Sequence, residues 1–366
     1  MGQENHFVYQ AVERMVSGTT KHGGELEMIA LNGLTKAFST GVIGLFAAVM
    51  LAALSPLKAG AAVCPLAILT CGCTISSPGS YTLSGASPMK STGTCVDITA
   101  SNVTLEGGPT IEGPGADTPT FGVHIEPSAN KVILESVTAE DFGQGIRIDG
   151  PNATTFIVLT KLNNKGTVVN GANAFLIEEI SEEDNAVGIQ VNATATNFVM
   201  VIGEALEEAG AGIELNGVSG AFLSEAVAEG DGTFGIWLKS ASDNVISGFE
   251  SEDNGVAGVY LGCNAAGPDG TACPAGQSPS NSNSLMGSVY GSTNSIVSNT
   301  GSPLNQRYGI AVGLGNLHNH FLTITGAGNV NDDALDENPD CGNNRWLFDT
   351  FTTSSPAKST TFTCLN

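Results

Sequence analysis

The sequence predicts an all-β protein wound as a parallel β-helix, and three observations point to this solenoid fold. A four-residue pattern of glycine, apolar, any and apolar residues recurs every 21 to 24 residues. The apolar runs between these tetrads are short and rich in β-branched and aromatic residues, which suits strands better than helices. Of the 366 residues, 47 are glycine and only 13% are charged, a composition unlike that of a helical bundle.

The N-terminal part of the chain is predicted to lie outside the folded domain. Residues 42–54 read VIGLFAAVMLAAL, an apolar core too short to span a bilayer comfortably, and small residues follow it at 59–61. We therefore expect a signal peptide at 28–61 and an upstream, disordered extension at 1–27. An uncleaved N-terminal anchor is the alternative. The remaining residues, 62–366, are expected to form a single β-helix domain.

Consecutive tetrads define the coils. The second and fourth residues of each tetrad should point inward and the third outward, because strand side chains alternate between the two faces. Stacking coils about 4.8 Å apart then joins the inward residues into apolar columns. The leading glycine would lie where a Cβ atom crowds the chain. The tetrads are Gly122–Ile125, Gly145–Ile148, Gly166–Val169, Gly188–Val191, Gly212–Leu215, Gly235–Leu238, Gly258–Leu261 and, after an insertion, Gly309–Val312.

The cysteines predict disulfides that fasten the ends and one loop. All eight follow the expected export signal, which indicates an oxidising compartment. Cys71 or Cys73 is expected to pair with Cys95, and the full pairing of these three with Cys64 stays open. Two further disulfide bonds are expected. Cys263–Cys273 would close a surface loop at residues 263–282, and Cys341–Cys364 would lie near the C-terminus.

Both ends of the repeat region carry motifs of a known family. Residues 71–83 read CGCTISSPGSYTL, residues 95–105 read CVDITASNVTL, and residues 341–351 read CGNNRWLFDTF. With the tetrads, these motifs resemble secreted bacterial right-handed parallel β-helix repeat proteins of the pectin-lyase-like superfamily. The resemblance covers residues 64–366 and implies a right-handed β-helix of roughly 9–11 coils. It does not specify an activity, because this superfamily includes lyases, hydrolases, epimerases, adhesins, phage tailspikes and binding proteins.

The outward residues of the tetrads form a column that is a candidate ligand surface. In the superfamily that the chain resembles, such residues commonly line a saccharide groove. Trp237 and Tyr260 fall on successive coils, so their rings could form an apolar platform for a sugar ring. Glu214 would accept hydrogen bonds from hydroxyl groups, and Lys239 would pair with a uronate carboxylate. An aromatic pair that only stabilises the sheet is the alternative.

Catalytic signatures are sparse. A lyase would need a base near a substrate carboxylate, and Arg147 and Lys239 are the candidates for that role. Acids recur in the third segment of each coil, where they either hold Ca²⁺ or simply face solvent. No metal site is assigned, and His318 and His320 lack an evident third ligand.

The residues that follow the tetrads include Asn170, Asn192 and Asn216, which predict a structural asparagine ladder.

These observations favour a secreted, periplasmic or surface-exposed protein that binds a polysaccharide or cell-surface glycan and needs no cofactor. The alternatives are a Ca²⁺-dependent polysaccharide lyase or epimerase, and a purely structural surface or adhesion rod. The net charge of −23 excludes binding to nucleic acid by charge. No membrane span is expected to remain after signal cleavage.

Overall fold

The computed structural model describes residues 62–183, 186–286, 294–297, 306–347 and 349–355. The expected signal peptide at 28–61, the extension at 1–27 and Cys364 lie outside these residues, as does the expected Cys341–Cys364 bond. Residues Lys58–Asn366 form one compact unit. Within the described residues, no helix has both the length and the apolar character needed to cross a membrane.

The chain is a parallel β-helix, as predicted. Within the described residues, sheet A has thirteen parallel strands, of which the two outermost are only two residues long, and the solenoid has about eleven coils. Its strands are β1 (Ala62–Val63), β3 (Cys73–Ile75), β6 (Val96–Ile98), β9 (Phe121–Ile125), β12 (Gln144–Ile148), β14 (Lys165–Val169), β16 (Val187–Asn192), β18 (Ala211–Asn216), β20 (Phe234–Lys239), β22 (Ala257–Leu261), β25 (Tyr308–Val312), β28 (Asp332–Asp336) and β31 (Ser354–Ser355).

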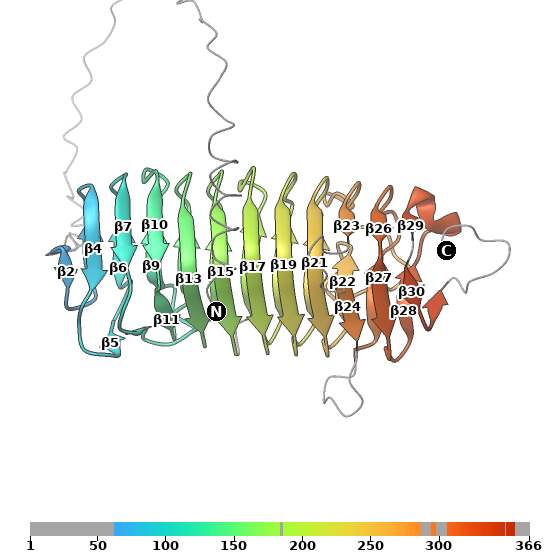
Figure 1. The fold of residues 1–366 in the computed structure, drawn as a ribbon, viewed down its shortest axis with the longest axis horizontal. Helices are drawn as coiled ribbons and strands as arrows, with labels where there is room; N and C mark the ends of the chain where they lie inside the picture. The colour runs from blue at the N-terminus through green and yellow to red at the C-terminus, as the bar shows by residue number, and fades with distance from the viewer. Residues whose placement is uncertain (1–61, 184–185, 287–293, 298–305, 348, 356–366) are drawn as a thin grey trace, which may run out of the picture. The chain divides into compact units, whose positions relative to one another are not determined.

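Sheet B covers the rest of each coil, and Figure 1 shows its long strands side by side from β13 to β21. Its strands are β2 (Ala67–Ile68), β4 (Gly79–Leu83), β5 (Met89–Lys90), β7 (Val103–Glu106), β8 (Ile111–Glu112), β10 (Val132–Glu135), β11 (Thr138–Glu140), β13 (Thr154–Lys161), β15 (Phe175–Glu182), β17 (Val199–Leu206), β19 (Phe222–Glu229), β21 (Val245–Glu252), β23 (Ser284–Met286), β24 (Asn294–Val297), β26 (His320–Leu322), β27 (Ile324–Ala327), β29 (Arg345–Leu347) and β30 (Thr350–Phe351). A 3₁₀ turn, η1, spans Pro339–Asn343.

Single residues in left-handed backbone conformation bend each long strand of sheet B into two faces. Successive coils place such residues at equivalent points, which divides each coil into three flat sides. One left-handed residue lets the chain turn without ending the hydrogen-bonded ladder. The column in the middle of sheet B consists of Ser136, Ile157, Glu178, Ile202, Glu225, Gly248 and Thr323.

The inward tetrad residues form the continuous core that the repeat predicted. Val123, Ile125, Ile213 and Leu215 are completely buried, and equivalent residues on neighbouring coils pack against them. The tetrad glycines allow a close approach between coils: a Cβ atom on Gly122 would lie 2.5 Å from the backbone oxygen of the next tetrad glycine. The space between coils, and not a positive φ, therefore requires glycine there.

Three disulfides connect described cysteines. Cys64 bonds to Cys73 and Cys71 bonds to Cys95, which resolves the pairing that the sequence left open. The predicted Cys263–Cys273 disulfide is confirmed. Two of these bonds therefore tie the first coils together, and the third closes the loop after β22.

The predicted asparagine ladder is present, and it flanks sheet A. Asn192 donates from Nδ2 to Asn170 Oδ1 at 2.8 Å, and Asn216 donates in the same way to Asn192 at 3.3 Å. Asn170 continues the ladder to Asp149 Oδ1 at 2.5 Å. A second ladder, buried at another corner, links Asn244, Asn283, Asn319 and Asn344. Side-chain amides thus bind successive coils where the backbone turns.

Glu179 places a carboxylate within the coil interior. Glu179 is completely buried and accepts hydrogen bonds from the hydroxyls of Thr155, at 2.9 Å, and Thr167. Burial raises the pKa of Glu179 to about 7, although the two hydroxyls act in the opposite direction. Thr167 occupies the inward tetrad position that is valine or isoleucine in the other tetrads. Its hydroxyl is a hydrogen-bond donor to the buried Glu179, which accounts for this departure from the repeat.

Candidate functional site on the outward face of sheet A

The third residues of the tetrads form a single outward column, as predicted. Strand register pairs each with its equivalent on the next coil of sheet A. In order, this column contains Asp97, His124, Arg147, Val168, Gln190, Glu214, Trp237, Tyr260 and Ala311. Its chemical character changes along the stack, from charged at β6–β12 to aromatic at β20–β22.

The aromatic part of the column is buried, so the rings of Trp237 and Tyr260 are not open to solvent. Trp237 is 6% exposed and Tyr260 only 2%. Their rings lie adjacent, with centroids 6.5 Å apart, and each also contacts Phe234, at 4.9 Å and 4.8 Å. Together with Ala211, Ala257 and Ala311 they form a second apolar cluster outside the coil interior.

The 263–282 insertion, with the residues that lead into it, covers these rings. The Trp237 indole donates from Nε1 to the carbonyl of Gly262 at 2.8 Å. Gly267 approaches so closely that a Cβ atom there would lie 2.7 Å from Val256. Burial, and then the negative charge of Glu337, raises the pKa of Tyr260. The rings therefore stabilise the loop, and their role in binding sugar stays an untested prediction.

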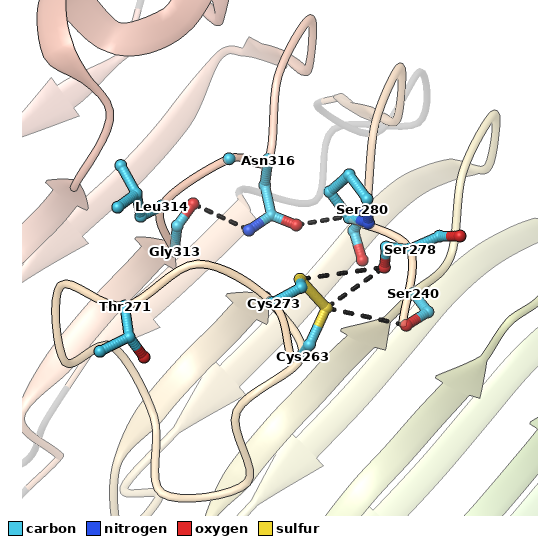
Figure 2. The surroundings of a disulfide bond; sticks show 12 residues. Ser240, Cys263, Thr271, Cys273, Ser278, Ser280, Gly313, Leu314 and Asn316 are labelled. Atoms are coloured by element: carbon cyan, nitrogen blue, oxygen red, sulfur yellow. Dashed lines mark hydrogen bonds between the residues drawn. A yellow bond between two sulfur atoms is a disulfide. The ribbon is translucent and has the colours of Figure 1, made fainter. Parts of the chain in front are cut away.

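Figure 2 shows how the far end of the insertion is held. Cys263 Sγ lies 3.2 Å from the carbonyl oxygen of Ser278. The Ser280 amide donates to Asn316 Oδ1 at 2.6 Å, and Asn316 donates onward to the carbonyl of Gly313 at 2.8 Å. The far end of the insertion thus lies against its own disulfide and is hydrogen bonded to the turn after β25.

The two charged residues predicted beside the rings do lie together. Lys239 Nζ is 3.5 Å from Glu214 Oε1 and 4.6 Å from the centroid of the Trp237 ring. Glu214 is buried and Lys239 is partly exposed. The ammonium of Lys239 therefore already has a carboxylate and a π-face as partners, and its predicted roles in binding or catalysis remain predictions.

The N-terminal part of the same face carries a partly exposed charged cluster centred on His124. Its Nε2 lies 3.0 Å from Asp149 Oδ2, while Nδ1 lies 3.2 Å from Asp97 Oδ1 and 3.4 Å from Glu126 Oε1. Burial lowers the pKa of His124, but the three carboxylates outweigh burial and raise it to about 9.

Arg147, the predicted base, completes this cluster. Its Nε donates to Asp149 Oδ2 at 2.7 Å, and its guanidinium carbon lies 5.5 Å from the centroid of the Phe121 ring. Burial disfavours the charged form of the Asp149 carboxyl. His124, Arg147 and Asn170 nevertheless donate hydrogen bonds to this carboxylate, and these bonds hold the pKa of Asp149 well below its usual range. The Arg147 side chain is 32% exposed, so its guanidinium still has access to a ligand.

The repeat predicts that His124, the third residue of its tetrad, faces outward, but it does not predict the cluster. Glu126 and Asp149 follow their tetrads at the positions equivalent to the asparagines of the ladder, and Asp97 belongs to a coil that lacks a tetrad glycine. Extending the column by one coil toward the N-terminus would have brought Asp97 beside His124.

The acids of the third segments line the second face of sheet B. Glu229 and Glu252 are opposite each other in register. Burial, and then the charges of Glu252 and Asp253, raises the pKa of Glu229. Among the described residues, the acids and histidines whose ligand atoms converge are Asp97, His124 and Glu126. His318 and His320 are exposed and do not belong to that group.

Comparisons with known proteins show similarity of fold alone. No family model and no curated protein sequence matches the chain. Among solved structures, the A-module of Azotobacter vinelandii mannuronan C-5 epimerase AlgE4 superimposes with a TM-score of 0.42 and 13% identity, covering 75% of this chain and 85% of that one. The Dettilon tailspike protein gives 0.45 and 13%, covering 75% and 60%. The enzymatically active domain of bacteriophage CBA120 tailspike protein 2 gives 0.39 and 16%, covering 68% and 36%.

Proposed function

We propose that this chain is an exported β-helix protein that binds a polysaccharide through the outward face of sheet A, at strands β6, β9 and β12. One observation carries the proposal: a partly exposed guanidinium, an aromatic ring and several carboxylates lie together on adjacent coils of one flat sheet. We therefore assign the binding surface to the cluster around Arg147 and not to the covered rings of Trp237 and Tyr260.

The chemistry of this surface suits a carbohydrate. Sugar hydroxyls both donate and accept hydrogen bonds, so they can pair with the carboxylates of Asp97 and Glu126 and with the guanidinium of Arg147. The ring of Phe121 offers an apolar surface for the C–H face of a sugar. The stacked strands β6, β9 and β12 also place these groups in a line, which an extended polymer can follow.

The charge of the protein favours a neutral, hydroxyl-rich polysaccharide. The chain carries a net charge of −23, and the cluster itself has three carboxylates against His124 and Arg147. An acidic glycan would be repelled at long range unless a cation bridged the two negative surfaces. Uronate polymers are therefore expected to bind more weakly than neutral ones.

Export is part of the proposal. Three disulfides among the described cysteines support an oxidising location, which for a bacterial-type chain means the periplasm, the cell surface or the medium. The apolar segment at 42–54, with small residues after it, supplies the expected signal.

Binding is tested by affinity electrophoresis of the full chain in gels that contain neutral or uronate polysaccharides. Arg147→Gln should weaken retardation by at least about tenfold, as expected for losing a charged hydrogen bond. Lys161→Gln is the matched control, because Lys161 pairs with Glu183 on sheet B. Equal loss in both variants contradicts the assignment, and no retardation by any glycan favours a structural rod.

A Ca²⁺-dependent lyase or epimerase is the second candidate, favoured by the position of Arg147 beside several carboxylates. A lyase releases unsaturated uronides, which absorb in the ultraviolet. Mixing the purified chain with pectate or alginate and Ca²⁺ should leave the absorbance unchanged if the protein only binds. A rise that Arg147→Gln abolishes would establish the lyase instead, and proton exchange at the uronate C5 would reveal an epimerase.

A further inference from the structure

We propose that Asp97, His124 and Glu126 form a binding site for a divalent transition-metal cation of the zinc class. The three residues come from two adjacent coils of sheet A, with Asp97 in β6, His124 in β9 and Glu126 directly after β9. One ligand atom from each lies within 4.8 Å of the other two. This site does not depend on the polysaccharide proposal.

The separations match a tetrahedral ion. Zinc bonds to imidazole nitrogen and carboxylate oxygen are about 2.0–2.1 Å long, so two ligand atoms of a tetrahedron lie about 3.3–3.4 Å apart. His124 Nδ1 lies 3.2 Å from Asp97 Oδ1 and 3.4 Å from Glu126 Oε1. Two edges of the polyhedron are therefore already formed by the protein.

A second observation points to a missing ligand at this place. Asp97 Oδ1 is buried from solvent, and its neighbour His124 Nδ1, at 3.2 Å, is an ion-pair partner and not an aligned hydrogen-bond donor. A buried carboxylate oxygen without a donor costs free energy that a hydrogen bond or a cation would recover. A metal ion that replaces the Nδ1 proton would bond to both this oxygen and Nδ1.

The second ring nitrogen of His124, Nε2, contacts a carboxylate, as the distal nitrogen of metal-bound histidines commonly does. In the neutral imidazole, donation from Nε2 to Asp149 Oδ2 at 3.0 Å selects the tautomer whose Nδ1 lone pair faces Asp97 and Glu126, so a bound cation replaces the proton that these carboxylates otherwise hold on Nδ1. Arg147 and Asn170 hold Asp149 in turn, at 2.7 Å and 2.5 Å. Asp149 is thus a positioning residue and not a ligand.

The ligand set selects the cation. Imidazole nitrogen with two carboxylates suits Zn²⁺ and its neighbours in the first transition row, whereas Ca²⁺ and Mg²⁺ favour all-oxygen sites with more ligands. Three protein ligands leave a fourth position, and the side chains of Asp97 and Glu126 are 31% and 34% exposed. That position is open to water or to an oxygen atom of a bound molecule.

The test is a calorimetric titration of the metal-stripped full chain with ZnCl₂, with Co²⁺ as an optical probe of tetrahedral geometry. The wild type should bind one Zn²⁺ that a large excess of Ca²⁺ does not displace. His124→Gln should abolish this site, and Asp149→Asn should weaken it by about 10–100-fold. Glu126→Gln is the second ligand variant, because this exposed side chain can be changed without disturbing the core.

The matched control is the double variant His318→Gln/His320→Gln, which removes exposed imidazoles elsewhere on the protein. It should retain the site and the visible absorption of bound Co²⁺. The proposal is overturned if Glu126→Gln and His124→Gln bind Zn²⁺ like the wild type, if the control loses the site, or if Ca²⁺ displaces Zn²⁺ at equal concentration. Zinc affinity is measured without glycan, so its outcome is independent of the electrophoresis result.

Discussion

The two ends of one outward column have opposite environments. At β9 and β12 the column presents His124 and Arg147, partly exposed and surrounded by carboxylates. At β20 and β22 it presents Trp237 and Tyr260, stacked and covered by the insertion. The strands that carry these residues have the same register and spacing, so the difference arises from what lies over the sheet.

This contrast shows that facing outward from a β-helix does not mean facing solvent. Apolar side chains on an outward face create a second core when a long enough connection is available to cover them. Charged side chains at the other end have no described connection over them, and they pair among themselves across coils. A ligand should therefore meet the charged end first.

Removing the ring of Tyr260 should have the largest effect. Tyr260→Ala should lower the free energy of unfolding by about 3–5 kcal/mol, because it leaves a cavity among packed rings. Phe121→Ala, at the charged end, is the matched control and should cost about 1 kcal/mol, because that ring is only half-buried. Urea denaturation followed by circular dichroism measures both. Equal losses would contradict the contrast between the two ends.

Glu179, in the coils between these ends, should make stability depend on pH. Its pKa is about 7 in the folded protein and near 4.5 in the unfolded chain. The folded state therefore holds its proton more tightly, and this contribution to stability is lost as pH rises from 4.5 through 7. The loss should reach about 3 kcal/mol near pH 8.

Glu179→Gln should remove that loss. The measurement is the unfolding free energy of the variant and of the wild type at pH 4.5, 6 and 8, and the difference between the two should change with pH. Glu178→Gln is the neighbouring control, because that side chain is only partly buried. If the Glu179→Gln difference stayed constant with pH, the carboxylate would be charged throughout and the interior more polar than described.

Opening the loop disulfide should loosen the covered end alone. The Cys263→Ser/Cys273→Ser variant loses a crosslink between residues ten apart, which stabilises by about 2–3 kcal/mol in the chain-entropy model. In a Trp346→Phe background, fluorescence reports Trp237, and its emission should shift to longer wavelength as water reaches the ring. An unchanged spectrum would show that packing holds the loop without the disulfide. Zinc affinity at His124 should not change.

The asparagine ladder should give the smallest effect. It runs beside sheet A from Asp149, at the charged end, toward Asn216. Asn192→Ala removes two side-chain hydrogen bonds and should cost about 1–2 kcal/mol, whereas Asn216→Ala removes one and should cost about half as much. Thermal unfolding compares the two variants, and a larger cost for Asn216 would mean that the ladder is not the cause.

The fold was predictable because a parallel β-helix repeats its chemistry at every coil. The glycine of each tetrad, inward residues such as Ile213 and Leu215, and ladder residues such as Asn192 recur every 21 to 24 residues. Their surroundings can therefore be predicted from the repeat alone. The loop disulfide was predictable for a related reason, since Cys263 and Cys273 enclose a short stretch rich in glycine and proline.

The site was less predictable because its determinants do not repeat. Whether Trp237 and Tyr260 are exposed depends on the path of a unique insertion, which no periodic argument describes. The cluster around His124 depends on contacts between a tetrad residue, a corner residue and a coil without a tetrad glycine. Only the three-dimensional stacking of β6, β9 and β12 brings these three kinds of position together.

The insertion also reveals where this architecture accepts extra chain. It leaves after β22, and the strand that follows it, β23, still pairs with β21, with Val245 opposite Ser284. The coils on both sides therefore keep their alignment although the connection between them is many residues longer than elsewhere. A foreign segment grafted at this corner would be displayed over sheet A without altering the ladder of strands beneath it.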